Sequence, residues 1–152
     1  METIDPAKMS RVWQRVKGEP AGESRKDGLL SLIAEEGTDA AAYLKLSREF
    51  AGSEGAKLRR LFQEEQAHAA CLKGIYTLIT GTRPVVRSAQ PELTDPEALL
   101  RRCYGREMQC LAKYEARASE PEFGVVFARL AEQEREHCRL VLELLGNLKK
   151  RG

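Results

Sequence analysis

The chain has 152 residues, of which 42% are hydrophobic, and its 25 basic and 23 acidic residues give a formal net charge of +2. This length and apolar content predict a substantial hydrophobic core and exclude a small, core-less scaffold. The nearly balanced charge gives no field strong enough to indicate a nucleic acid or an anionic membrane as partner, and we expect neither.

The sequence shows no pattern typical of a membrane span, a signal peptide or a cysteine-bound metal site. No apolar run approaches the roughly 18 residues of a membrane span, and residues 1–10 lack the basic and apolar regions of a signal peptide. The four cysteines include no Cys-x-x-Cys pair, which is the local spacing of zinc knots and rubredoxin-type iron centres. These features predict a soluble, cytoplasmic protein with reduced thiols.

Residues 1–27 form the first predicted unit, an N-terminal segment with a short amphipathic helix. Apolar residues recur there at helical spacing before a group of glycines and a proline that ends the pattern. We expect this helix to lie on the main body through Trp13. A partner-docking role for the same helix is the alternative.

Residues 28–152 form the second predicted unit, a bundle of four long helices. Apolar residues follow one face of each helix, called its apolar stripe below. Asp95 or Thr94 is placed to cap the third helix, which has Pro96 in its first turn. The periodic ranges are about 28–50, 58–79, 95–118 and 127–148. The fold class is therefore predicted to be all-α, with two helical hairpins.

The motif Glu-x-x-His occurs twice and includes the only two histidines of the chain, as Glu65 with His68 and as Glu134 with His137. Residues three apart on a helix share one face and lie about 4.5 Å apart along the axis. A carboxylate and an imidazole at this spacing can bind one metal ion. Both pairs lie on apolar stripes, so we expect them to be buried.

The two halves of the bundle repeat one pattern. Glu36 precedes Tyr43 by seven residues, just as Glu107 precedes Tyr114 by seven. Each half is thus a hairpin that carries Glu, Tyr and Glu-x-x-His. In an antiparallel hairpin, two residues are level when their numbers average to the turn. The upstream acid and the histidine average to 52 in the first half and 122 in the second, close to the two predicted turns.

Four acids on buried stripes require a counter-charge. The stripes carry no Lys or Arg, and an unpaired buried ion costs several kcal/mol. Two divalent metals would balance the charge, with two neutral imidazoles completing the set of ligands. Oxygen donors mixed with nitrogen favour iron or manganese over calcium, and zinc is a further option. The predicted metal ligands are Glu36, Glu65, His68, Glu107, Glu134 and His137.

Other polar or reactive residues lie close to these positions in sequence. Cys103 and Cys110 flank Glu107 on its stripe and could approach the metals, although small apolar filler is the favoured interpretation. Cys71 and Cys138 have the same interpretation. The acids that lie off the stripes are expected to be solvated rather than to bind metal, namely Glu35, Glu64, Glu132 and Glu136.

At these residues the sequence resembles the ferritin-like carboxylate proteins, and specifically the rubrerythrin group. The resemblance covers about residues 29–148 and includes the Glu-x6-Tyr and Glu-x-x-His elements of both halves and the Leu-Ile-Thr-Gly at 78–81. It implies a ferritin-like four-helix bundle and two iron ions on the six ligands. It also implies that Tyr43 and Tyr114 donate hydrogen bonds to the carboxylates, whereas plain core packing is the alternative for a buried tyrosine.

The connection from Gly81 to Asp95 can reach about 50 Å when extended, which is enough to run the length of a bundle. Such a long crossover is the ferritin-like arrangement, and exchange of a hairpin between subunits would use the same linker. The resemblance also implies a homodimer or small homo-oligomer. One departure is Cys110, which stands where rubrerythrins often carry an additional carboxylate.

The resemblance implies an iron oxidoreductase that reduces hydrogen peroxide. No rubredoxin domain accompanies the bundle, so we expect electrons to come from an external donor. Glu65 and Glu134 are expected to bridge the ions, with Glu36 and Glu107 terminal. Three alternatives stay open: a ferroxidase or iron-handling protein, an oxidase or hydroxylase that activates dioxygen, and a non-enzymatic helical interaction module that keeps a metal only for folding.

Overall fold

The computed structural model describes residues 22–92 and 95–151, with side chains described for 25–92 and 95–150. Within these ranges the chain forms four helices and no strand, which confirms the all-α prediction for this part. The helices are α2 (Gly22–Ser47), α3 (Gly52–Thr80), α4 (Pro96–Arg117) and α5 (Gly124–Arg151). Trp13 and the amphipathic helix predicted around it lie outside the described residues.

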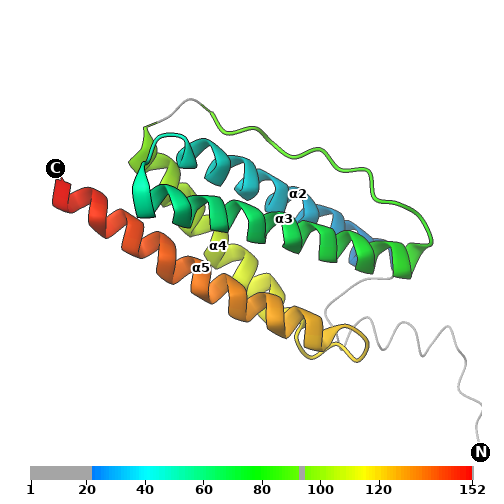
Figure 1. Cartoon of the computed structure of the whole chain (residues 1–152). Helices are drawn as coiled ribbons and strands as arrows, with labels where there is room; N and C mark the ends of the chain where they lie inside the picture. The colour runs from blue at the N-terminus through cyan, green and yellow to red at the C-terminus, as the bar shows by residue number, and fades with distance from the viewer. Residues whose placement is uncertain (1–21, 93–94, 152) are drawn as a thin grey trace, which may run out of the picture.

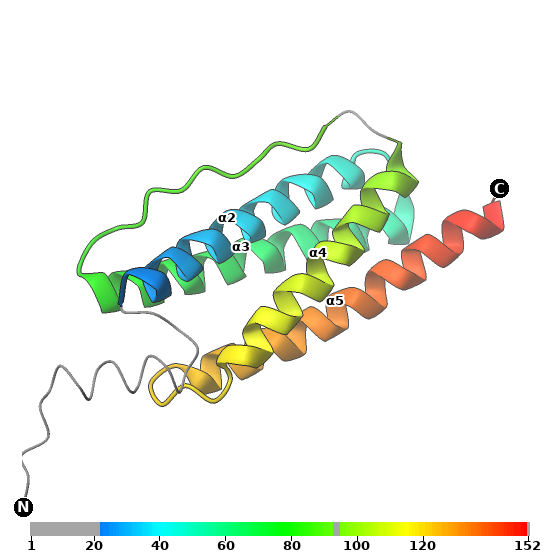
Figure 2. The same ribbon diagram turned by 180° about the vertical axis from the view of Figure 1, so that it is seen from behind.

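The four helices form two antiparallel hairpins, α2 with α3 and α4 with α5, which lie against each other (Figures 1 and 2). The connection between α3 and α4 runs along the outside of α2 to the opposite end of the bundle (Figure 1). It is attached there by two hydrogen bonds, from Ala89 N to Thr38 Oγ1 at 3.1 Å and from Lys45 Nζ to Glu92 O at 2.9 Å. The described part of this segment therefore crosses the bundle in an extended form.

The helix ends follow from local chemistry. Asp95 caps α4, since its carboxylate accepts hydrogen bonds from the backbone N–H groups of Glu97 and Ala98. Gly81 ends α3 in the left-handed region with φ of 75°, and its N–H donates to Thr77 O at 2.8 Å. One start differs from prediction: α2 begins at Gly22, so residues 22–27 already belong to the bundle helix.

Two apolar clusters lie on either side of a polar layer at the middle of the bundle. The first includes Leu29 and Leu72, and the second includes Leu46 and Leu58. Along every helix, residues of one cluster precede the polar layer and residues of the other follow it. Each fully buried leucine contributes about 2 kcal/mol, so the apolar clusters stabilise the fold around a layer that is costly to bury. We call this polar layer the acid layer; it contains Glu36, Asp39, Glu65, His68, Glu107, Glu134 and His137.

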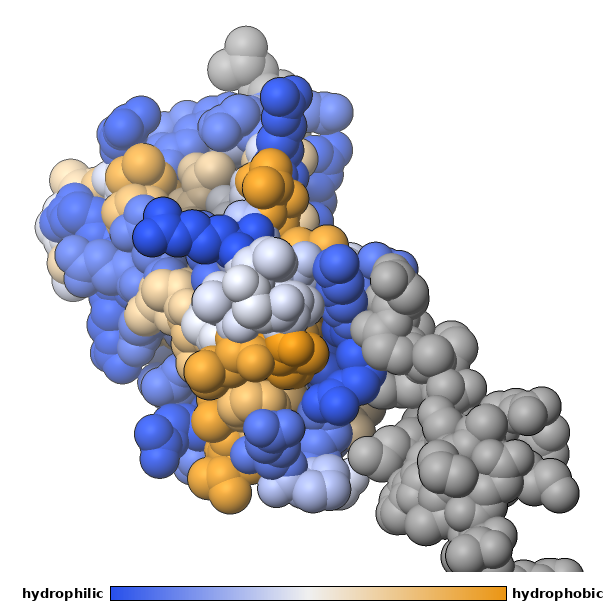
Figure 3. Space-filling view, turned by 90° about the vertical axis from the view of Figure 1, so that its right-hand side faces the viewer, coloured by the Kyte–Doolittle hydropathy of each residue, from blue (hydrophilic) through white to orange (hydrophobic). Residues whose placement is uncertain are grey.

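One end of the bundle carries an apolar patch bordered by hydrophilic side chains (Figure 3). Figure 3 views the end at which α3 finishes and α5 starts, and apolar side chains gather on this face. Leu78 near the end of α3 and Val125 at the start of α5 are both exposed. Among the described residues, no helix combines the length and apolarity needed to span a membrane.

Candidate metal centre

The structure brings all six predicted ligands together in the acid layer. Each of the four helices supplies one glutamate, and α3 and α5 each add a histidine one turn later. All six are buried: the relative exposure is 0% for the four glutamates, 3% for His68 and 1% for His137. Four acids are therefore held in the interior of a small bundle, away from water.

The histidine rings join the two hairpins. His68 Nδ1 lies 3.4 Å from Glu36 Oε2 of its own hairpin and 3.0 Å from Glu134 Oε1 of the other. His137 Nδ1 lies 3.5 Å from Glu107 Oε2 of its own hairpin and 2.6 Å from Glu65 Oε1 of the other. The contacts within each hairpin confirm the prediction that the upstream glutamate and the histidine lie at the same height along the bundle. The two rings stack with their centroids 5.3 Å apart.

The outer nitrogen of each histidine has its own partner on the opposite hairpin. His68 Nε2 lies 2.6 Å from Gln133 Oε1, and His137 Nε2 lies 3.3 Å from Glu64 Oε2. With a metal ion bound at Nδ1, the oxygen acceptors at Nε2 would hold each ring in the tautomer that is protonated at Nε2. Partners of this kind orient metal-binding histidines in proteins.

Glu64 corrects one expectation. It was expected to be solvated, but its side chain is only 33% exposed and accepts from His137. Gln133 occupies the equivalent position in the second half, directly before Glu134 as Glu64 is directly before Glu65. The equivalent positions of Glu64 and Gln133 in the two halves could have indicated a shared role. Their contacts are with the opposite hairpin, however, and the apolar periodicity of one helix does not predict contacts of that kind.

The two tyrosines exchange hydrogen bonds between the hairpins. Tyr43 of α2 donates to Glu107 Oε1 at 2.8 Å, and Tyr114 of α4 donates to Glu36 Oε1 at 2.6 Å. Both phenols are fully buried. Burial, and then the charge of the nearby acid, raises the pKa of each phenol, so both stay protonated donors. Each tyrosine thus holds one oxygen of a glutamate and leaves the other oxygen free.

Several buried ligand atoms have no hydrogen-bond partner among the described residues. An unsatisfied buried polar group costs about 1–3 kcal/mol, so a set of them at one place needs a compensating charge. His137 Nδ1 and Glu65 Oε1 are only 2.6 Å apart, yet both are among these atoms. The set comprises Glu36 Oε2, Glu65 Oε1 and Oε2, Glu107 Oε2, Glu134 Oε2 and His137 Nδ1.

These donors fit metal ions. Burial and the charges of Glu36 and Glu107 raise the pKa of Glu65 well above its usual value, which reports the excess of negative charge. One group able to hold an ion consists of Glu65, His68, Glu134 and His137, whose ligand atoms all lie within 4.8 Å of one another. A cation there would satisfy the unpartnered atoms and balance the charge.

Asp39 is a further buried acid that the sequence reasoning missed. It is 1% exposed, and its ligand oxygen lies within 4.8 Å of those of Glu65 and Glu107, which defines a second group able to hold an ion. Arg106 Nε donates to Asp39 Oδ1, but Oδ2 has no partner. Burial outweighs the nearby guanidinium and raises the pKa of Asp39 to about 8. Its position one turn after Glu36 was the signal available.

The cysteines follow the filler interpretation. Cys103 and Cys110 are buried in the two apolar clusters, and neither belongs to a group able to hold an ion among the described residues. Burial raises the pKa of both thiols, so they stay protonated. Glu35 corrects an expectation, because its side chain is 25% exposed and accepts from Lys113 at 2.6 Å and from Cys110 Sγ at 3.6 Å.

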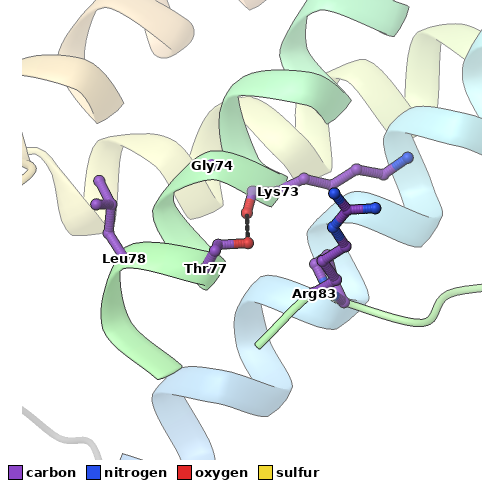
Figure 4. Close-up of a pocket in the computed structure, with 6 residues that line it drawn as sticks. Lys73, Gly74, Thr77, Leu78 and Arg83 are labelled. Atoms are coloured by element: carbon purple, nitrogen blue, oxygen red, sulfur yellow. Dashed lines mark hydrogen bonds between the residues drawn. The ribbon is translucent and has the colours of Figure 1, made fainter. Parts of the chain in front are cut away.

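Two surface pockets lie outside this centre. One of about 560 Å³ is formed by the last turns of α3 and the start of the crossover, where Thr77 Oγ1 donates to Lys73 O and Arg83 lies opposite (Figure 4). Another of about 340 Å³ lies between α2 and α4, beside Arg25 and Arg117. None of the six predicted ligands lines either pocket.

Comparison of the chain with protein-family models, with curated proteins and with solved structures finds no match. No relative therefore names a cofactor or a reaction. The described residues themselves establish a strand-free, four-helix fold with a buried Glu/His cluster that is able to hold a metal ion.

Proposed function

We propose that this chain is a di-iron oxidoreductase of the ferritin-like, rubrerythrin type, which reduces hydrogen peroxide with electrons from an external donor. The observation that carries the proposal is the acid layer: four glutamates and two histidines, all at most 3% exposed, face one another with several ligand atoms unpartnered. A bundle that buried these groups without cations would lose stability at each of them.

The topology supports the ferritin-like part of the proposal. Two antiparallel hairpins are joined by a segment that crosses the length of the bundle (Figure 1). This arrangement relates the hairpins by an approximate two-fold axis, which the crossed hydrogen bonds of Tyr43 and Tyr114 follow. Di-iron carboxylate proteins place their ligands in the core of such bundles.

Charge and ligand chemistry support two divalent ions of an oxygen- and nitrogen-binding transition metal. Four carboxylates balance two divalent ions, and two imidazole nitrogens favour iron or manganese over calcium. Two ferrous ions, when bound, supply the two electrons that, with two protons, convert one peroxide molecule into two waters. An external donor returns two electrons for the next turnover.

The chain's own residues divide the work of holding such a pair. Glu36 and Glu107 are each fixed at one oxygen by a tyrosine, which suits a terminal ligand with one free oxygen. Glu65 has no hydrogen bond at either oxygen and lies in both groups that are able to hold an ion. Freedom at both oxygens suits a carboxylate that bridges two ions and changes its binding mode during the reaction.

Burial of the centre supports a small substrate. The six candidate ligands are at most 3% exposed, so a reactant has to reach them through the packed interior of the bundle, which favours a small molecule. Hydrogen peroxide is small and needs no shaped cavity. Dioxygen meets the same size requirement, so the relative rate with the two oxidants decides between them.

The experiment that tests the proposal is iron analysis of protein reconstituted without oxygen, followed by stopped-flow oxidation. We expect about two irons per chain and oxidation by peroxide much faster than by dioxygen. Glu107→Gln should lower the iron content, whereas Glu132→Gln, an exposed acid on α5, should leave it unchanged. Faster oxidation by dioxygen, or uptake of iron well beyond two per chain, would contradict a peroxidase.

A further inference from the structure

The two halves of the acid layer are not equivalent. Helices α2 and α4 carry the same glutamate and tyrosine, but they differ one residue before and three residues after the glutamate. Among the equivalent positions that differ are Glu35 against Arg106, and Asp39 against Cys110. Asp39 therefore lies beside Arg106 on one side of the centre. On the other side, Cys110 lies beside Glu35.

The geometry around Asp39 is that of a ligand with one free oxygen. Its Oδ1 accepts from Arg106 Nε, and its Oδ2 is buried with no hydrogen-bond partner. The ligand oxygens of Asp39, Glu65 and Glu107 lie within 4.8 Å of one another. Both oxygens of Glu65 and Oε2 of Glu107 are also without a partner, so three acids leave unpartnered oxygens at one place.

Arg106 is the cation of this cluster. Its side chain is 34% exposed and reaches inward from the surface, and its Nη2 donates to the backbone oxygen of Glu35 at 3.2 Å. The guanidinium contacts Asp39 from the outer side of the cluster. Cys110 is the residue of α4 that is equivalent to Asp39. Its Sγ donates to Glu35 Oε2 at 3.6 Å, and the neutral thiol contributes no charge.

We propose that Asp39 is a seventh ligand of the centre, which binds the ion at the Glu107–His137 position, so that the two ion positions differ in affinity. This inference rests on the proposed metal centre. The Glu107–His137 position has an additional hard oxygen donor, whereas the Glu36–His68 position has a neutral thiol at the equivalent residue. Arg106 stays on Oδ1 of Asp39 and leaves Oδ2 for the ion, and the charge of the guanidinium opposes the charge of the ion.

The test uses Co²⁺ as probe, titrated into the metal-free full-length chain without oxygen and followed by calorimetry and visible absorption. The parent chain should bind two Co²⁺ ions with different affinities. Asp39→Asn keeps the size of the side chain but removes its charge, and we expect it to weaken one ion by about tenfold or more. The affinity for the other ion should stay within about twofold.

Two further variants complete the design. Cys110→Ser changes the equivalent residue on the other side and should leave both affinities within about twofold. Arg106→Gln removes the competing cation, so the ion that Asp39→Asn weakens should bind several-fold more tightly, while the metal-free protein melts at a lower temperature. This opposite sign keeps the test decisive if Asp39→Asn folds poorly.

Each remaining outcome overturns the inference. If Asp39→Asn lowers the melting temperature but leaves both Co²⁺ affinities unchanged, Asp39 and Arg106 form a structural ion pair only. An equal loss at both positions would exclude a ligand of one ion. If the parent binds two Co²⁺ ions and none of these substitutions changes the affinities, the proposed function still stands but the inference about Asp39 fails. If the parent binds no Co²⁺, both the proposed function and this inference fail.

Discussion

At the scale of single residues, the centre is built from crossed contacts. Tyr43 and Tyr114 each donate to a glutamate of the other hairpin, and each histidine lies within 3.0 Å of an acid of the other hairpin. Loss of one donor therefore affects an acid on a different helix. The effect of a substitution must be sought at the partner rather than at the changed position.

Replacing Tyr114 by Phe removes the donor to Glu36 Oε1 and leaves that buried oxygen unsatisfied. We expect the metal-free protein to lose about 1–3 kcal/mol of stability and one metal ion to bind about tenfold more weakly. Urea unfolding and metal titration measure the two effects. Tyr104→Phe is the control, because this partly buried tyrosine of α4 packs beside the second apolar cluster; a loss equal to that control would contradict the assigned role.

The stability of the metal-free protein should fall as the pH rises. Burial raises the pKa of Asp39 from 3.8 to about 8, and burial with neighbouring charge raises that of Glu65 above 4.5. Between the unfolded and the folded pKa the folded chain holds more protons, so stability decreases with pH. His68 acts in the same direction, since Glu36 raises its pKa above 6.5 although burial alone would lower it.

Urea unfolding in chelator, from about pH 5 to about pH 8, measures this slope. Glu36 has the opposite sign: burial alone would raise its pKa, but its close contacts with Glu65 and His68 lower it, and its contribution to stability changes only below its ordinary value of 4.5. Asp39→Asn cannot titrate and should show a shallower decline. Stability that rises over this range, or an unchanged slope in the variant, would contradict the pKa shift of Asp39.

At the scale of the elements, each helix places its part of the acid layer between two apolar segments, and the hairpin turns set the height. Gly55 lies against the turn of the first hairpin: a Cβ there would be 2.3 Å from Phe50 O. Gly124 has the same relation to Ala118 O, at 2.5 Å, in the second hairpin. Glycine is needed where the backbone comes this close.

Substituting Ala for two glycines of α3 should change stability in opposite directions. Gly55→Ala should destabilise the protein by about 1–3 kcal/mol, since the added methyl meets a backbone oxygen that cannot move freely. Gly74→Ala has open space around it and should stabilise by up to about 1 kcal/mol through helix propensity. Thermal unfolding of the two variants tests this, and the same sign for both would be inconsistent with the turn geometry.

Much of this organisation could be predicted from the sequence, because it repeats within single helices. Gly81 and Asp95 marked the end of α3 and the start of α4, and the burial of the six candidate ligands could be predicted because they lie on apolar stripes. The start of α2 was missed, since Gly22 and Gly28 resemble breakers although the helix includes both. Asp39 was missed because its neighbours Arg106 and Glu107 belong to another helix, and the periodicity of one helix does not reveal contacts with another.

At the scale of the whole molecule, the acid layer is where the two hairpins meet. The apolar clusters on both sides would hold the hairpins together without it, yet the layer concentrates the unpartnered ligand atoms of four helices at one height. Ions bound there would link the hairpins, and binding to the folded state alone adds about 4 kcal/mol of stability at a thousand times the dissociation constant. Fold and chemistry thus depend on the same layer.

The most direct measurement of the central claim is an anomalous-scattering map at the iron edge, from crystals of protein reconstituted with ferrous iron in the absence of oxygen. The account predicts two peaks per chain inside the acid layer, one beside His68 and one beside His137, with Glu65 and Glu134 between them. A map with iron only on the surface, or with the six side chains hydrogen-bonded to one another and to water around no ion, would contradict it.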